Sequence, residues 1–85
     1  MMIPAVQSVQ NKQNERAILI CTNGIGACIL ANKVDGIRGA TLYSESSARK
    51  TRRDHDSNVA CLPAGEFTEQ EIQSFIKAWL TEKYE

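Results

Sequence analysis

The sequence predicts an α/β fold built on a parallel sheet of about three strands flanked by helices. Three short apolar runs, each typical of a buried strand, alternate with segments of helical pattern. This alternation, repeated three times, indicates parallel strands joined by right-handed crossovers. The 85 residues form one domain at most, and a domain of this size buries only somewhat more than ~60% of its unfolded surface. The predicted strands are Ala17–Cys21, Ile37–Tyr43 and Asn58–Leu62.

Residues 1–15 are polar and rich in glutamine, and they precede the predicted domain of residues 16–85. A short helix can begin at Pro4, because proline suits the first helical turn. A frayed tail is the alternative, and the sequence leaves both open. The apolar residues that follow Pro4 in this segment are Ala5, Val6 and Val9.

The first predicted strand, AILIC, is a continuous apolar run too short for a helix. Such a run is typical of a strand buried on both faces, as in parallel sheets. A sharp loop over residues 22–26 follows, and the next segment predicts a short helix over Ala27–Lys33. Asp35 and Gly36 then form a turn before the second strand.

Capping signals mark the last two predicted helices. Ser44 can cap a helix over Glu45–Arg53, which is polar and basic and is therefore predicted to face solvent. Thr68 and Glu71 form a T-x-x-E capping box after the breaker at residues 63–65. The final helix is predicted to bury one apolar stripe, with spacings of three and four, formed by Ile72, Phe75, Ile76 and Leu80.

The charge balance restricts the possible partners. Ten basic and ten acidic residues cancel, whereas a nucleic-acid or anionic-membrane partner normally requires a basic excess. No apolar run approaches the ~20 residues of a membrane span. The N-terminal residues lack the basic and apolar regions of a secretory signal, so the expected compartment is the cytoplasm.

The three cysteines are predicted to be thiols. An odd number in a cytoplasmic chain argues against a disulfide framework, and a zinc site is not expected because there is no CxxC pair and His55 is the single histidine. Cys28 and Cys61 are predicted to be small buried hydrophobes.

The segment from Ile18 to Gly26 carries the clearest chemical signal, because a strand that ends in Cys21 is followed by a glycine-containing loop and a helix start. The N–H groups at a helix start lack intrahelical partners and favour negative charge. Cys21 could move a proton while these amides hold the oxygen of an enediolate, and Asn23 could hydrogen-bond a sugar hydroxyl or carbonyl. From the G-x-G spacing alone, a purely structural turn is the favoured interpretation, because many α/β turns need glycine there. The loop is neither a full dinucleotide fingerprint nor a Walker loop.

The combined pattern ILIC, GIG, ANKV, GIR, SAR and NV over residues 16–82 resembles the C-terminal half of ribose-5-phosphate isomerase B and its galactose-6-phosphate isomerase relatives. This resemblance implies a Rossmann-like sheet, a shortened version of the family's αβα sandwich. It also implies cofactor-free interconversion of aldose and ketose phosphates through a cis-enediolate. Cys21 matches the family's proton-transferring cysteine, and residues 24–26 match its anion-stabilising loop. Family sites are completed across a dimer interface.

The chain also departs from the family pattern. It lacks the first strands with their Asp-His pair and the later arginines, and no positive charge lies near Gly65. The family's ring-opening histidine aligns with Asp54, and the neighbouring His55 is either its shifted replacement or a solvated side chain. Arg49, Arg52 and Arg53 could bind phosphate or simply face solvent. The predicted site therefore has Cys21 and Asn23 as catalytic residues, with anion or substrate contacts from Thr22, Gly24, Ile25, Gly26, Ala27, Asp54 and His55.

These observations leave several functions open. The first is a sugar-phosphate isomerase subunit whose site is completed by a homo-oligomer or a complementary chain. The second is a catalytically inactive sugar- or anion-binding or regulatory remnant, and the third is a truncated product with no independent role. A three-stranded sheet leaves the first apolar strand as an edge, which predicts pairing with another chain at or beside that strand.

Overall fold

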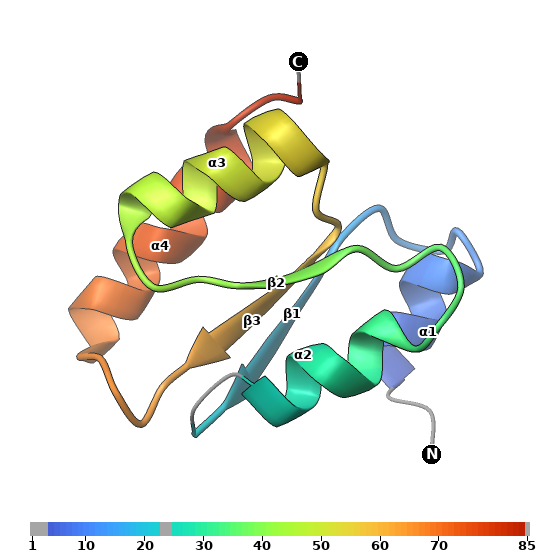
Figure 1. Cartoon of the computed structure of the whole chain (residues 1–85), viewed down its shortest axis with the longest axis horizontal. Helices are drawn as coiled ribbons and strands as arrows, with labels where there is room; N and C mark the ends of the chain where they lie inside the picture. The colour runs from blue at the N-terminus through green and yellow to red at the C-terminus, as the bar shows by residue number, and fades with distance from the viewer. Residues whose placement is uncertain (1–3, 23–24, 85) are drawn as a thin grey trace.

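The structure is a computed structural model that describes residues 4–22 and 25–84 of the chain. Figure 1 shows a central sheet with helices on both of its faces, as the α/β prediction requires. The elements are, in chain order, α1 (Pro4–Gln10), β1 (Ala17–Cys21), α2 (Ile25–Asn32), β2 (Gly39–Thr41), α3 (Glu45–His55), β3 (Val59–Pro63) and α4 (Glu69–Thr81).

The three strands are parallel in the order β1-β3-β2, so the last strand is central. The chain passes from β1 to the far edge through α2 and returns to the centre through α3. Because right-handed crossovers in opposite directions use opposite faces, α2 and α3 cover different sides of the sheet. Figure 1 shows α1 with α2 on one side and α3 with α4 on the other.

Two apolar clusters fill the spaces between the layers. Successive strand side chains point to opposite faces, so Leu19 and Cys61 pack under α1 and α2, while Ala60 and Leu62 pack under α3 and α4. All five residues of β3 are buried, which is expected of a strand with neighbours on both edges and helices on both faces.

The first strand has its predicted bounds, and the other two differ. The third strand is displaced by one residue and ends at Pro63. The second is much shorter than Ile37–Tyr43, because Ile37 belongs to the preceding turn through its N–H bond to the Val34 carbonyl. Arg38 N–H bonds to the Asn58 side chain at 2.7 Å, and this contact anchors the chain before β2 begins.

The helices follow the predicted caps with shifted ends. Of the two possibilities for the N-terminal residues, the structure has the helix beginning at Pro4, with Val6 and Val9 buried against the sheet. α2 starts two residues before the predicted Ala27, and α3 extends past Arg53 to His55. The predicted caps form at the starts of α3 and α4, including the reciprocal Thr68–Glu71 box.

The prediction that the basic helix faces solvent is wrong for Arg52. This side chain is buried, and its guanidinium donates to Asp56 Oδ1 at 2.8 Å and to the Ser57 carbonyl. The reason is that α3 packs against α4, and residue 52 falls on the packed side. Burial of an arginine requires such a charged partner, which Asp56 supplies from the left-handed C-cap.

The predicted stripe of α4 is wrong at Leu80, which is half exposed. Trp79 is fully buried in its place and donates from Nε1 to Ser57 Oγ at 2.8 Å. The helical period explains the difference, because residue 79 lies seven positions after Ile72 and therefore on the same face. None of the described helices has the length and apolar character that a membrane crossing requires.

Candidate functional site

Cys21 ends β1 at the carboxyl edge of the sheet, where ligands bind in open parallel folds. Its side chain is half-buried, and the following Thr22 is exposed. The loop after β3 lies directly against this segment, because Ala64 N–H donates to the Cys21 carbonyl at 2.8 Å and Gly65 N–H donates to the Thr22 carbonyl at 2.9 Å. These two hydrogen bonds therefore join the loop after β1 to the loop after β3 beside Cys21.

Gly65 makes this close approach possible. A Cβ at this position would lie 2.8 Å from both the Thr22 carbonyl oxygen and Thr22 Cγ2, a distance that side chains do not tolerate against backbone. A breaker was all that residues 63–65 indicated from the sequence, so this contribution of Gly65 was not predicted. The available signal was a glycine shortly after the third apolar strand, which reaches the same edge of the sheet as the first.

The first turn of α2 forms the other side of this loop. Because α2 begins at Ile25, the predicted contact residues Ile25, Gly26 and Ala27 together form that turn. N–H groups of a first helical turn point out of the helix start and favour a nearby negative charge. A Cβ at Gly26 would meet nothing within 4 Å, so open space adjoins the turn. Asn23 and Gly24 lie outside the described residues.

Three thiols lie around this end of β1, none of them in a disulfide. Cys61 is fully buried, as predicted, whereas Cys28 is only half-buried. Burial, followed by a hydrogen bond with Cys28, raises the pKa of the Cys61 thiol far above its usual value, and Cys21 adds to this shift through its charge. Cys61 is therefore a neutral core residue, whereas Cys21 and Cys28 are both more accessible.

The carboxyl edge has an unusual charge for a phosphate site. The strand ends lead into residues 21–27, 42–48 and 63–71, and these three segments contain no Lys, Arg or His. They do contain four glutamates. Backbone amides at this edge can hold a single oxyanion, but a phosphate dianion normally also requires cationic side chains. The acidic side chains are Glu45, Glu66, Glu69 and Glu71.

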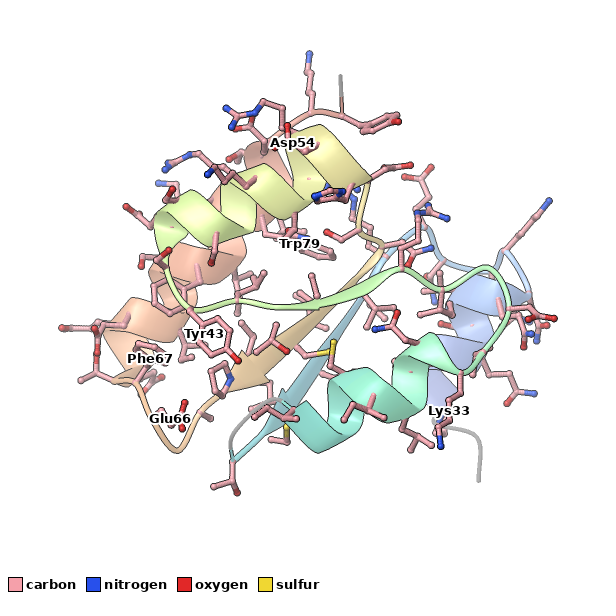
Figure 2. All side chains as sticks on the ribbon, in the orientation of Figure 1. Lys33, Tyr43, Asp54, Glu66, Phe67 and Trp79 are labelled. Atoms are coloured by element: carbon pink, nitrogen blue, oxygen red, sulfur yellow. The ribbon has the colours of Figure 1, made fainter. Side chains whose placement is uncertain are left out.

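Asp54 and His55 do not approach Cys21 within the chain. Both are exposed at the end of α3, which runs back from the carboxyl edge to the amino edge of the sheet. Figure 2 shows Asp54 at the opposite end of the molecule from Glu66, which belongs to the loop beside Cys21. The structure therefore separates the predicted site residues into two groups.

The arginines of α3 have contacts of their own. Arg52 is buried on Asp56, Arg53 lies 3.4 Å from Asp54, and Arg49 lies 4.0 Å from Glu82. The possibility that all three bind a phosphate beside Cys21 does not agree with these positions. Among the described residues, no group of three or more His, Cys, Asp or Glu side chains could hold a metal ion.

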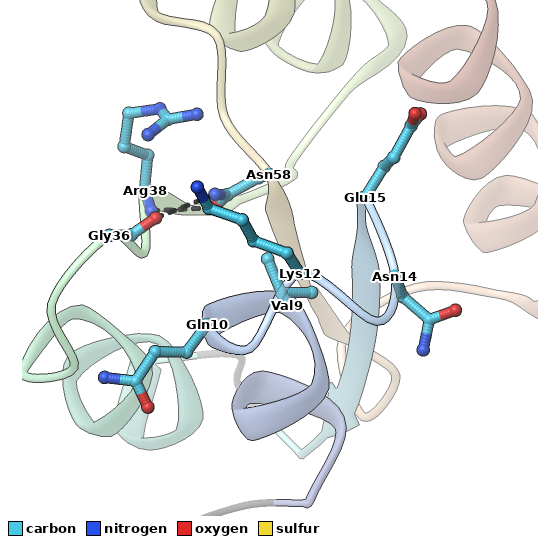
Figure 3. Close-up of a pocket in the computed structure, with 8 residues that line it drawn as sticks. All are labelled: Val9, Gln10, Lys12, Asn14, Glu15, Gly36, Arg38 and Asn58. Atoms are coloured by element: carbon cyan, nitrogen blue, oxygen red, sulfur yellow. Dashed lines mark hydrogen bonds between the residues drawn. The ribbon is translucent and has the colours of Figure 1, made fainter.

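A polar pocket of about 600 Å³ lies at the amino edge of the sheet, away from Cys21. In Figure 3, the side chain of Lys12 crosses in front of Asn58 toward Arg38. Both polar atoms of the Asn58 amide are engaged, because it donates to the Gly36 carbonyl at 2.9 Å and accepts from Arg38 N–H. These two hydrogen bonds hold the turn before β2 in place. The pocket wall formed by Gly36, Arg38 and Asn58 is therefore explained by a structural role.

Comparison with known proteins identifies the family. A family model described as Ribose/Galactose Isomerase matches residues 1–85. The chain is 36% identical over 78 residues to the D-erythrulose-4-phosphate isomerase of Pectobacterium atrosepticum, covering 92% of this chain and 51% of that protein. It is 36% identical over 72 residues to the ribose-5-P isomerase B of Listeria innocua, covering 85% of this chain and 49% of that protein.

Solved structures agree with this relationship. The ribose-5-phosphate isomerase B of Giardia lamblia superposes with a TM-score of 0.93 at 28% identity, covering 95% of this chain and 65% of that one. The type B ribose 5-phosphate isomerase of Trypanosoma brucei superposes with a TM-score of 0.91 at 33% identity, covering 93% and 53%. The chain thus has a Rossmann-like α/β fold and spans about half the length of the curated relatives it matches. It belongs to the ribose/galactose isomerase family.

Proposed function

We propose that this chain supplies the catalytic loop of a sugar-phosphate aldose–ketose isomerase that acts through a cis-enediolate. The observation that carries the proposal is the position of Cys21 at the end of β1, directly before the first turn of α2. Cys21 acts as the base: its thiolate takes the proton from the hydroxyl-bearing carbon beside the carbonyl and returns it to the former carbonyl carbon, while the hydroxyl proton passes to the former carbonyl oxygen. Only protons move in this reaction, so no cofactor is needed.

The loop stabilises the charge that develops during proton transfer. When the C–H bond breaks, the electron pair moves onto the carbonyl oxygen, and N–H donors of residues 24–27 hold that oxygen. Thr22 and Asn23 provide side chains for the sugar hydroxyls. The close contact between Gly65 and Thr22 holds the residue that directly follows Cys21, which supports a fixed position for the end of β1 during the reaction.

A second chain completes the site in this proposal. The acidic carboxyl edge supports this part, because it offers no cation for the substrate's phosphate. In this proposal Asp54 and His55 contact the Cys21 loop of a neighbouring subunit, because within their own chain they lie at the opposite end of the sheet from Cys21. The matched relatives act, by name, on erythrulose and ribose phosphates, so we propose a short-chain sugar phosphate as substrate and the cytoplasm as the compartment.

The test is isomerisation of ribose 5-phosphate and D-erythrulose 4-phosphate by the purified chain and by Cys21→Ala. Loss of a general base typically costs on the order of 10²–10⁴-fold in rate, so Cys21→Ala should abolish measurable turnover. Cys28→Ala is the matched control, because Cys28 is also a half-buried thiol but lies within α2. Equal losses in both variants, or full activity in Cys21→Ala, would contradict the proposed role of Cys21.

A binding module without turnover is the second candidate, and the separation of Asp54 and His55 from Cys21 within the chain favours it. In this case the amide signals of Ile25, Gly26 and Ala27 should shift on titration with a sugar phosphate in NMR spectra, while no isomerisation is detected. Unchanged amide signals together with no turnover would exclude both candidates for the chain by itself.

A further inference from the structure

Two thiols meet between α2 and the central strand β3. Cys61 lies in β3 and is fully buried, and Cys28 lies in α2 and packs against the same apolar cluster. A hydrogen bond joins the two thiols. Their sulfur atoms are therefore already in contact in the reduced protein, and a disulfide between them requires only a small further approach.

The sulfur of Cys28 is held in this position by its neighbours. Asn32, one turn later in α2, donates from Nδ2 to Cys28 Sγ at 3.6 Å and to the Gly39 carbonyl at 3.1 Å. A Cβ at Gly39 would lie 3.5 Å from Cys28 Sγ, so the sulfur lies against this residue. Gly39 pairs with Val59, and the next residue of β3 on the same face is Cys61. These contacts therefore keep the Cys28 sulfur over the part of β3 that contains Cys61.

Cys21 lies too far along β1 to take the place of Cys28. The residue of β1 that pairs with Cys61 is Leu19, and Cys21 follows it by two positions. A rise of about 3.3 Å per residue and a strand spacing of about 4.8 Å place the Cα atoms of Cys21 and Cys61 about 8 Å apart. A disulfide requires Cα atoms within about 6.8 Å of each other. The sheet geometry therefore favours Cys28 as the partner of Cys61.

We infer that Cys28 and Cys61 form a reversible oxidation site, at which hydrogen peroxide closes a disulfide between α2 and β3. Cys28 is the more accessible of the two and reacts first: its sulfur attacks one peroxide oxygen, the O–O bond breaks, and a sulfenic acid and one water form. The sulfur of Cys61 then attacks the sulfenic sulfur, the S–O bond breaks, and the Cys61 proton leaves with the hydroxide as a second water. The two thiols together supply the two electrons that reduce the peroxide.

The disulfide would fasten the helix that begins beside Cys21 to the centre of the sheet. It closes a loop over residues 28–61, which restricts the unfolded chain, so the oxidised form should resist denaturant better than the reduced form. In a reducing compartment the bond would be transient and would follow exposure to peroxide. The inference concerns these two thiols alone and does not depend on the proposed isomerase activity.

Peptide mapping after peroxide treatment tests the inference on the intact chain. Trypsin places Cys28 in a peptide of residues 17–33 and Cys61 in a peptide of residues 54–77. After treatment with hydrogen peroxide, alkylation and digestion without reductant, the two peptides should be joined with the loss of two hydrogen atoms in mass. Two of the three thiols should disappear, and dithiothreitol should restore them. Because Cys21 shares the first peptide, fragment-ion sequencing must place the bond at Cys28.

Two variants provide the matched comparison, and circular dichroism checks that both fold. Cys21→Ala should form the linked peptides as the unchanged chain does, and its urea midpoint should rise on oxidation. Cys28→Ala should give neither the link nor the rise. A bond at Cys21, a disulfide-linked dimer, thiols lost without a link, or three thiols that persist after peroxide treatment would overturn the inference. Because the readout is the covalent bond, failure of the isomerase assay leaves this result unaffected.

Discussion

The two edges of the sheet differ in how they end. At β2, a strand of three residues, the side chain of Asn32 bonds both backbone groups of the first residue, Gly39. At β1, five residues run to the carboxyl edge with Ile18 and Ile20 directing their backbone groups outward. The outer side of β2 is thus closed by a side chain at Gly39, whereas no described strand pairs with the outer side of β1.

The same contrast explains where the chemistry lies. Cys21 belongs to the edge strand β1, and the loop after β3 contacts the end of this strand through Ala64 and Gly65. One wall of the candidate site is thus built by the loops after β1 and β3. Disturbing the built wall should therefore have larger effects on the isolated chain than changing the open edge.

The largest effect on stability is expected from Gly65→Val. The added Cβ would approach the Thr22 carbonyl to 2.8 Å, so the two loops must separate. Overpacking of this kind costs about 1–3 kcal/mol, and the backbone contact places Gly65→Val near the upper end. Urea unfolding would measure the loss. Gly26→Val is the control, because its Cβ meets nothing within 4 Å and should change the free energy of unfolding far less; equal losses would remove the steric argument.

A second test uses Cys61, the buried thiol of the central strand β3. Burial raises the pKa of Cys61 in the folded state, while the unfolded thiol keeps a pKa near about 8.5. The stability due to neutral Cys61 is therefore complete below pH ~8.5 and is lost as the pH rises toward the folded pKa, at about 1.4 kcal/mol per pH unit.

Between pH 8.5 and 10 the expected loss of free energy of unfolding is about 2 kcal/mol, measured by denaturant titration at several pH values. Cys61→Val removes the titrating group at similar volume, so its profile should be flatter over this range. A wild-type profile that is already flat would show that Cys61 is not the group whose ionisation accompanies unfolding.

These contacts also mark how far the sequence could predict the structure. The apolar runs and capping boxes predicted the fold class, the bounds of β1 and the starts of α3 and α4, because burial period and caps are local properties. The contacts of Gly65 with Thr22 and of Asn32 with Gly39 join segments that meet only after the sheet has formed. Local patterns could not reveal them.

The prediction of which helix residues are buried was wrong for a related reason. Arg52 is polar by composition, yet it is buried because α3 packs against α4 and Asp56 neutralises it. The predicted stripe included Leu80 instead of Trp79, although a position seven residues after Ile72 lies on the same helix face as Ile72. Asp54 and His55 are separated from Cys21 because α3 runs from the carboxyl edge of the sheet to its amino edge. The alternation of strands and helices already implies this direction.

Asn32→Ala should have a smaller effect and would break the contrast between the edges. It removes two hydrogen bonds to Gly39 at an exposed position, so the expected loss is about 1 kcal/mol. Asn32→Asp keeps the acceptor for Gly39 N–H and loses the donor, so an intermediate value is expected. The Gly39 amide should exchange faster with solvent only in Asn32→Ala. An unchanged exchange rate would show that the side chain does not close this edge.

The smallest effect is expected from Ile20→Lys in the isolated chain. Ile20 is 63% exposed, and substitutions at such positions usually change the free energy of unfolding by no more than about 0.5 kcal/mol. A negligible loss, compared with the loss in Asn32→Ala, would show that the β2 edge contributes more than the β1 edge to the stability of the isolated chain. A loss equal to that of Asn32→Ala would instead mean that the isolated chain already buries Ile20, through self-association or a rearranged edge. Sedimentation velocity of the same samples would decide between these two, because self-association depends on concentration and a rearranged edge does not.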